Sequence, residues 1–290
     1  MFRVILALLL TFFTYTVAAA NYEREFKDIE QRYQRMVPHI IKLSDQFGLS
    51  AELIATTIYK ESSFRPHAKH RKSTATGLMQ LTKPTARSMI AKYGKQLGIK
   101  RGANLYDPVV NVKLGTAYLH DVREVVESRI NRKATDAEIY LAFKYSPERA
   151  VKMIRHRGSH RMIDFYPGAA AGNPKDYFHK GRALTVSQTK AKITSGFRAA
   201  KQYYGPKIAK DVAMYRAKEA ATKALAIERR IFREVLRTYE RMRRETPPAW
   251  LAMGTSLKGV PQRVITDATI RPYEELNGLT SGRTYKGIPI

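Results

Sequence analysis

Apolar residues recur every three or four positions between residues 22 and 140, which restricts this part of the chain to packed helices. Tyr33, Met36 and Ile40 follow this spacing, and so do Ile54 and Ile58. Such a period places apolar side chains on one face of a helix, whereas a strand would alternate them. No stretch alternates long enough to indicate a sheet, although a short hairpin within residues 66–76 stays open. We therefore predict a mainly α fold.

Helix start signals divide this region into separate helices. Ser50 precedes an apolar-periodic run, and Asp107 is followed by Pro108. A Ser or Asp side chain can accept a hydrogen bond from a free backbone N–H of the first turn, and Pro is tolerated at the first helical position. We expect helices to begin after Ser50 and at Asp107-Pro108, and another to begin at Thr135 or Asp136.

The distribution of Pro, Gly and charge predicts four segments. Residues 1–20 are set apart from the rest. Residues 21–180 form a first folded domain that closes in a stretch containing Pro and Gly, and residues 181–245 form a basic helical region. Residues 246–290 contain further Pro and Gly and are expected to form a loosely docked tail.

The composition is strongly basic. The chain holds 52 Lys and Arg against 25 Asp and Glu, a formal net charge of +27. Such a charge attracts polyanions, namely nucleic acid, anionic lipid or cell wall, without determining the fold. Cysteine is absent. Disulfides, thiolate metal sites and cysteine nucleophiles are therefore excluded, and packing must hold the fold together.

The first twenty residues have the organisation of an export signal. Arg3 supplies a positive charge, an apolar stretch follows over residues 4–13, and residues 17–20 read Val-Ala-Ala-Ala. Small residues in this position are typical of a signal peptidase site. An uncleaved membrane anchor is the alternative, but the apolar stretch is short for a span of about 20 residues. In either case we expect an exported protein of the periplasm or cell envelope.

Glu61 is an acid on a helix face that otherwise carries apolar side chains. Ile54, Ile58 and Glu61 fall at positions i, i+4 and i+7 of the predicted helix. A buried carboxylate is costly unless a cation pairs with it or a raised pKa keeps it protonated. An ion pair with Arg65 is one explanation. The other is the general acid of a glycosidase, which an apolar pocket keeps protonated near neutral pH.

A second group of candidate residues follows at positions 77–80, Gly-Leu-Met-Gln. Gly77 would let the backbone approach a ligand closely, Met79 offers an apolar wall, and the Gln80 amide can donate and accept hydrogen bonds. Ordinary packing of Met79 and a surface position for Gln80 are the alternative explanation. Neither residue alone indicates a site.

Together these residues resemble the soluble lytic transglycosylase (SLT) family of the lysozyme superfamily. The first matching block comprises Glu61-Ser62-x-Phe64-x-Pro66-x-Ala68, Gly77-Leu78-Met79-Gln80 and Pro84-Thr85-Ala86. The second comprises Asn104-Leu105-Tyr106-Asp107-Pro108, Asn111-Val112, Gly115-Thr116 and Tyr118-Leu119. The resemblance covers about residues 45–155, and both blocks occur in the order and near the spacing of the family.

The resemblance implies a mainly α, lysozyme-like domain that cleaves the β-1,4 bond between N-acetylmuramic acid and N-acetylglucosamine in peptidoglycan. In the family, the acid matching Glu61 protonates the leaving oxygen. As a carboxylate it then removes a proton from the muramoyl 6-hydroxyl, which closes a 1,6-anhydro ring without consuming water, and no cofactor is implied. A second carboxylate, as most glycosidases have, is not evident near Glu61. Gln80 and Met79 are candidates for substrate binding, with the Gln80 carbonyl facing charge at the anomeric carbon.

The loop after Glu61 departs from the family pattern. The family places a serine nine residues after its acid, where this chain has His70. Because the loop is one residue longer than usual, Ser73 is the candidate for that substrate-binding serine. His67 and His70 resemble half of a metal site, but the loop contains no acid, so we expect no metal.

The third family block, Ala-Tyr-Asn-Ala-Gly-Pro, corresponds to residues 142–147. Phe143 replaces the tyrosine, which predicts the loss of a hydroxyl near the acid, and Lys144 replaces the asparagine. Tyr145 or Ser146 could restore a donor, and Tyr145 is the candidate substrate-binding residue. These changes leave reduced or lost activity open.

Residues 181–245 carry 17 Lys and Arg against six acids. Leu225, Phe232 and Tyr239 lie at heptad spacing among arginines, so we predict an amphipathic basic helix that is interrupted at Gly205-Pro206. It either packs on the catalytic domain or binds an anionic wall polymer, a membrane surface or an envelope-spanning assembly. Nucleic acid is the weaker candidate, because the chain contains no recognised nucleic-acid motif.

Three functions fit these observations, and the leading one is an exported peptidoglycan lytic transglycosylase that uses Glu61. The second is a non-catalytic, basic wall-binding or assembly protein that kept the fold. The third is a lysozyme-type hydrolase on the same fold.

Overall fold

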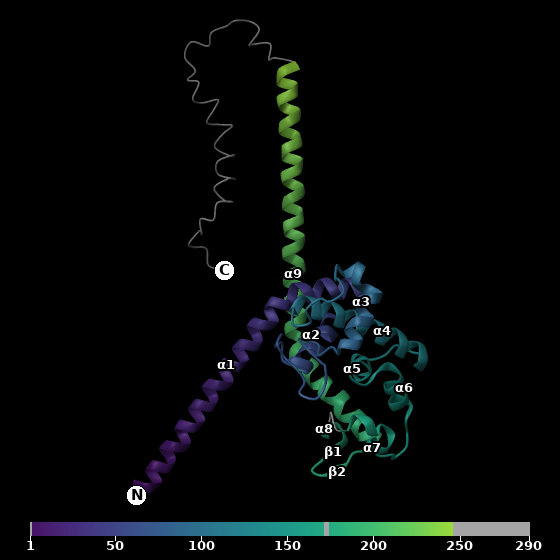
Figure 1. Ribbon diagram of the computed structural model, residues 1–290. Helices are drawn as coiled ribbons and strands as arrows, with labels where there is room; N and C mark the ends of the chain where they lie inside the picture. The colour runs from purple at the N-terminus through teal and green to yellow at the C-terminus, as the bar shows by residue number, and fades with distance from the viewer. Residues whose placement is uncertain (1, 171–173, 246–290) are drawn as a thin grey trace. The chain divides into compact units, whose positions relative to one another are not determined.

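The computed structural model describes residues 2–170 and 174–245 (Figure 1). In chain order the elements are α1 (Phe2–Phe47), α2 (Ala51–Ser62), α3 (Lys83–Leu97), α4 (Pro108–Ile130), α5 (Asp136–Tyr145), α6 (Pro147–Arg155), α7 (Met162–Phe165), the 3₁₀ turn η1 (Pro167–Ala169), α8 (Pro174–Tyr177), β1 (Phe178–His179), β2 (Arg182–Ala183) and α9 (Val186–Glu245). The mainly α prediction is confirmed. The predicted tail over 246–290 lies outside the described residues.

Helix α4 is the centre of the folded core. Helices α1, α2, α3, α5 and α6 all pack against it, and Figure 1 shows α3 to α6 gathered together. Val112, Leu119 and Val126 of α4 are fully buried. Their spacing of seven residues keeps them on one side of the helix, so α4 presents a continuous apolar stripe to its neighbours.

The predicted helix starts are confirmed by side-chain caps. Ser50 Oγ accepts a hydrogen bond from Leu53 N at 3.1 Å before α2. Asp107 Oδ1 accepts from two backbone N–H groups in the first turn of α4, at 2.8 and 2.9 Å. Thr135 and Glu138 form a capping box at α5. These caps satisfy backbone donors that a helix start leaves unpaired.

Short antiparallel pairings supplement the helices. Lys69 pairs with Thr76 in an antiparallel bridge, within residues 66–76 where the sequence allowed a short hairpin. Strands β1 and β2 form a hairpin that the sequence analysis did not predict. Lys180 and Gly181 connect its strands with φ of 47° and 78°, as a two-residue hairpin turn requires. Strands of two residues are too short to show alternation, which explains why the pattern missed them.

The predicted interruption of the basic helix at Gly205-Pro206 is wrong. Helix α9 continues through Pro206. The missing N–H of proline removes one helical hydrogen bond. However, Tyr204 and Ile208 are both buried on either side of it, and this packing outweighs the local loss.

The first compact unit ends at Ala220, well beyond the domain boundary expected at residue 180. Val186, Phe197 and Ile208 from the first half of α9 are buried in the core. The Pro- and Gly-containing stretch before α9 is therefore a connection within the unit. Residues 221–245 belong to a second unit.

Helix α1 begins at Phe2 and includes most of the segment expected to be an export signal or anchor. Among the residues that the structure describes, we find no helix with the length and apolar character needed to cross a membrane.

Candidate active site

Glu61 lies in the last turn of α2, on the same face as Ile54 and Ile58. Both isoleucines are completely buried, and Glu61 is partly buried. The helix ends one residue later, where Ser63 and Phe64 adopt left-handed φ angles of 51° and 58°. The chain thus turns sharply next to the acid, which leaves the carboxylate at the edge of the core.

The carboxylate of Glu61 is hydrogen-bonded rather than ion-paired. The Tyr140 hydroxyl on α5 donates to Glu61 Oε1 at 2.9 Å. Arg65, the expected ion-pair partner, instead donates from its Nε atom to the Ser62 carbonyl oxygen at 3.0 Å. Among the described residues no ion pair involves Glu61.

Burial raises the pKa of Glu61 above its ordinary value and is the largest influence on it. The charge of Lys144 and the hydrogen bond from Tyr140 lower this pKa, but by less than burial raises it. Both neighbours stabilise the carboxylate, whereas burial disfavours it. The side chain therefore keeps its proton to higher pH than an exposed glutamic acid, as a general acid needs.

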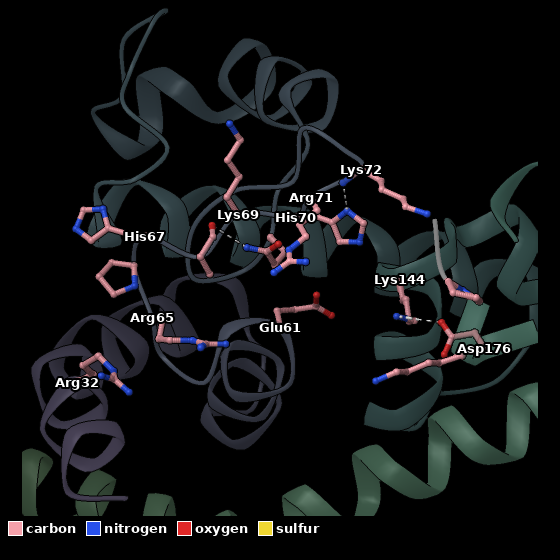
Figure 2. A pocket seen from close by; sticks show the side chains of 15 residues that line it. Arg32, Glu61, Arg65, His67, Lys69, His70, Arg71, Lys72, Lys144 and Asp176 are labelled. Atoms are coloured by element: carbon pink, nitrogen blue, oxygen red, sulfur yellow. Dashed lines mark hydrogen bonds and ion pairs between the residues drawn. The ribbon is translucent and has the colours of Figure 1, made fainter. Parts of the chain in front are cut away.

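Glu61 opens onto a cleft of about 1470 Å³ (Figure 2). Its walls come from α1, the loop after α2, the end of α5, and α8. Typical small-molecule sites have about 300–1,000 Å³, so this cleft has room for a polymer segment. Its basic lining residues are Arg32, Arg65, Lys69, Arg71, Lys72, Lys144 and Lys175.

Asp176 on α8 brings a second carboxylate into the same cleft. Lys144 Nζ lies 3.3 Å from Asp176 Oδ2, and the Tyr145 hydroxyl donates to that oxygen at 3.2 Å. Figure 2 shows the ion pair beside Glu61. The structure thus contains a carboxylate in the Glu61 cleft that was not evident from the sequence. No pattern in the sequence links Asp176 to Glu61, because a stretch rich in Pro and Gly separates it from the motifs.

The side-chain amide of Gln80 is fixed at the cleft wall. Its Nε2 atom donates to the Ala68 and Gly77 carbonyl oxygens at 3.0 and 2.9 Å. Among the described residues no donor contacts Gln80 Oε1. The nitrogen is thus committed to the loop, and the carbonyl oxygen remains available as an acceptor.

A known protein family matches the part of the chain that carries Glu61 and the loop with Gln80. Residues 38–155 match the family model described as Transglycosylase SLT domain. This chain contains an SLT domain. The match includes Glu61, Gln80 and Tyr140 but ends before Asp176.

The relatives of this SLT domain share only part of their length with the chain. Proteins named membrane-bound lytic murein transglycosylase C, from Pectobacterium atrosepticum, Yersinia pestis and Yersinia pseudotuberculosis, are 35% identical over 91 residues. The match covers 31% of this chain and 25% of each relative. A solved structure of an inactive mutant of lytic transglycosylase Slt from Pseudomonas aeruginosa gives a TM-score of 0.41 at 22% identity, covering 59% of this chain and 24% of that one.

Met79 lies in the interior of the SLT domain and is completely buried. Its backbone N–H donates to Asn111 Oδ1 at 2.7 Å. A Cβ atom at Gly115 would collide with the Met79 sulfur, so the glycine makes room for this side chain. Gly77 has φ of 81°, and a Cβ there would collide with Asn111. Gly77 thus allows the loop to approach α4 rather than the ligand that we expected.

Ser73 and His70 lie in different hollows of the SLT domain. His70 lines the Glu61 cleft, and its Nδ1 atom accepts from Lys72 N at 3.1 Å. Ser73 is exposed and lines a second hollow of about 650 Å³, and Lys69 contributes to both hollows.

The predicted loss of a hydroxyl near the acid is wrong. Phe143 packs against the Tyr118 ring, with centroids 5.3 Å apart. Tyr140, one helical turn earlier, supplies the hydroxyl at Glu61 instead. Tyr145 faces Asp176. A helical turn places residues i and i+3 near each other, so a search one turn either side of Phe143 would have found Tyr140.

Proposed function

We propose that this protein is an exported peptidoglycan lytic transglycosylase whose general acid and base is Glu61. The observation that carries the proposal is the position of Glu61: partly buried, with a raised pKa, held by Tyr140 and facing a polymer-sized cleft. The SLT domain match and the relatives named as lytic murein transglycosylases support this reaction class.

The first step is protonation of the leaving group. Protonated Glu61 donates its hydrogen to the glycosidic oxygen between N-acetylmuramic acid and N-acetylglucosamine as the bond from that oxygen to the anomeric carbon breaks. The electron pair of the bond leaves with the oxygen, so positive charge develops at the anomeric carbon. The Gln80 carbonyl oxygen is placed to face that charge, since its amide nitrogen is held by the loop.

The second step returns the proton. The Glu61 carboxylate accepts the hydrogen of the muramoyl 6-hydroxyl, and the freed oxygen bonds to the anomeric carbon. A 1,6-anhydro ring closes, no water is consumed, and Glu61 is protonated again. Tyr140 and Lys144 stabilise the carboxylate between the two steps.

The other candidate residues have supporting roles. Met79 packs under the loop that carries Gln80. The Tyr145 hydroxyl hydrogen-bonds Asp176, which in turn forms an ion pair with Lys144 in the cleft wall. Ser73 lines the neighbouring hollow, where it can hydrogen-bond a further part of the glycan strand.

Export is supported by the pattern of residues 1–20, which places Arg3 before an apolar stretch and small residues. The relatives are named as membrane-bound. We propose the periplasm or cell envelope as the location, where peptidoglycan is the substrate.

Digestion of purified peptidoglycan followed by mass spectrometry tests the reaction. We expect anhydro-muropeptides, and a Glu61→Gln variant should lose at least about a thousandfold in cleavage rate while still sedimenting with peptidoglycan. Full turnover by this variant would remove Glu61 from the mechanism. Intact peptidoglycan with tight binding by the unaltered protein would favour a non-catalytic wall-binding protein.

Asp176 favours one alternative, a lysozyme-type hydrolase in which a second carboxylate activates water. However, Lys144 Nζ and the Tyr145 hydroxyl already contact its Oδ2 atom, so that oxygen is engaged rather than free to bind a water. Products heavier by one water than the anhydro-muropeptides would support the hydrolase.

A further inference from the structure

The second unit contributes a helix segment with an exposed apolar face, residues 221–245 of α9. Its large apolar side chains are between 41% and 62% exposed. They are Leu225, Ile227, Ile231, Phe232, Val235, Leu236, Tyr239 and Met242. Single exposed apolar residues are common, but eight within five helical turns form a patch that requires a partner.

These side chains occupy one half of the helix circumference. At 100° per residue, Leu225, Phe232 and Tyr239 lie within a narrow sector, and the other apolar residues extend it to about half the circle. The opposite face carries Arg230, Arg237 and Arg241. In all, residues 221–245 hold eight Lys and Arg against four Glu.

The geometry points to an anionic lipid surface as the partner of residues 221–245. We propose that this segment lies in the interface of a bilayer, with its apolar face among the acyl chains and its arginines at the headgroups. A broad apolar face opposite a cationic face is the pattern of interfacial helices. This inference does not depend on the proposed catalytic function.

Two other occupants fit less well. A soluble anionic polymer would neutralise the arginines but leave the apolar face in water. A second copy of the helix would cover that face, but Arg229 lies at its border, so two parallel copies would set like charges along one seam. A lipid surface satisfies both faces at once.

Flotation of the full chain with lipid vesicles tests the inference. We expect binding to phosphatidylcholine vesicles containing about 30% phosphatidylglycerol, at least about tenfold weaker binding to pure phosphatidylcholine, and weakening of the former by salt. Absence of binding, or equal binding to both vesicles, would overturn it.

Two neighbouring substitutions distinguish the effect of the apolar face on vesicle binding from the effect of net charge. Leu225→Glu places an acid on the apolar face, whereas Ala226→Glu places the same charge on the polar face. We expect the first to weaken vesicle binding by about tenfold and the second by less than about threefold. Equal losses would show that charge alone is responsible and contradict the inference.

Sedimentation velocity and peptidoglycan cleavage complete the test. A lipid-free dimer that Leu225→Glu converts to a monomer would identify a second copy as the occupant and overturn the lipid assignment. Both variants should keep the circular dichroism of the unaltered chain and cleave vesicle-free peptidoglycan at the same rate. A chain that binds vesicles as expected but never cleaves peptidoglycan would contradict only the catalytic proposal.

Discussion

The proton on Glu61 is set by neighbours that act in opposite directions. Burial favours the neutral acid, while Lys144 and Tyr140 favour the carboxylate. Asp176 neutralises part of the Lys144 charge and raises the pKa of Glu61 slightly. In the proposed reaction Glu61 both donates and accepts a proton, and each of these two forms has neighbours that stabilise it.

Tyr140→Phe tests the hydrogen bond to Glu61. We expect kcat to fall by about ten- to a hundredfold, because the carboxylate loses both its orientation and its donor. The Tyr140 hydrogen bond lowers the pKa of Glu61, so its loss raises that pKa. The acid form then persists to higher pH, so the alkaline limb of the pH–rate profile moves to higher pH.

Tyr145→Phe is the matched control, because its hydroxyl contacts Asp176 rather than Glu61. We expect its alkaline limb to stay near that of the unaltered protein. If the alkaline limb of Tyr140→Phe moved to lower pH, or if the limbs of both variants moved equally, the assigned role of Tyr140 would be contradicted. Both profiles are measured from anhydro-muropeptide release.

At this scale the acid could be found from the sequence, because Glu61 breaks the apolar pattern set by Ile54 and Ile58. Tyr140 could be found only by searching one helical turn either side of Phe143, since a tyrosine on a buried helix face otherwise looks like core until its hydroxyl is seen to reach Glu61. The position of Asp176 near Glu61 depends on the path of the chain between α6 and α8, which local sequence patterns do not predict.

Among the elements, the loop from Thr76 to Gln80 is held by one side chain of α4. Asn111 is completely buried. Its Oδ1 accepts from Met79 N at 2.7 Å, and its Nδ2 donates to the Thr76 and Leu105 carbonyl oxygens, both at 2.9 Å. A single amide therefore bonds three backbone groups, two of them buried, and fixes the loop that carries Gln80.

Asn111→Ala should lower the free energy of unfolding by about 2–5 kcal/mol, because Met79 N–H and the Leu105 carbonyl oxygen lose their partner, and the Thr76 carbonyl oxygen keeps only the Leu81 N–H. Urea denaturation measures this loss. Asn104→Ala is the control: Asn104 is exposed, and its side-chain Oδ1 accepts from Tyr106 N at 2.9 Å, so we expect a loss of less than about 1 kcal/mol. Equal losses would show that the loop does not depend on Asn111.

The helices were predictable wherever a local signal decides them. Ser50, Asp107 and Thr135 act as caps through contacts within one helical turn. The interruption at Pro206 was wrong because the outcome depends on burial of Tyr204 and Ile208, which is tertiary information. The β1–β2 hairpin was missed for a different reason, since its strands carry too few residues to show a period.

For the whole molecule, the extent of the folded core is the property that sequence composition misjudged. The charge of α9 suggested a separate basic region from residue 181. Yet the first half of α9 buries Val186, Phe197 and Ile208 in the core, and the Phe197 ring stacks on Tyr140 of α5. Phe197 thus supports the tyrosine that contacts Glu61, so the beginning of α9 belongs to the folded unit around Glu61 rather than to an appendage.

Two truncations test where the folded unit ends. A chain ending at Ala220 keeps every buried residue of the described core, so we expect its Tm to lie within about 3 °C of the full chain and its cleavage of peptidoglycan in solution to match that of the full chain.

A chain ending at residue 180 loses five large buried side chains, those of Val186, Ile193, Phe197, Tyr204 and Ile208. Each buried side chain of this size contributes about 1.5–3 kcal/mol, and five of them equal most of the about 5–15 kcal/mol that stabilises a domain. We therefore expect the shorter chain to show no cooperative thermal transition by circular dichroism. Cooperative unfolding of the 180-residue chain, with cleavage retained, would place the boundary where composition alone had put it and would separate Phe197 from the support of Tyr140.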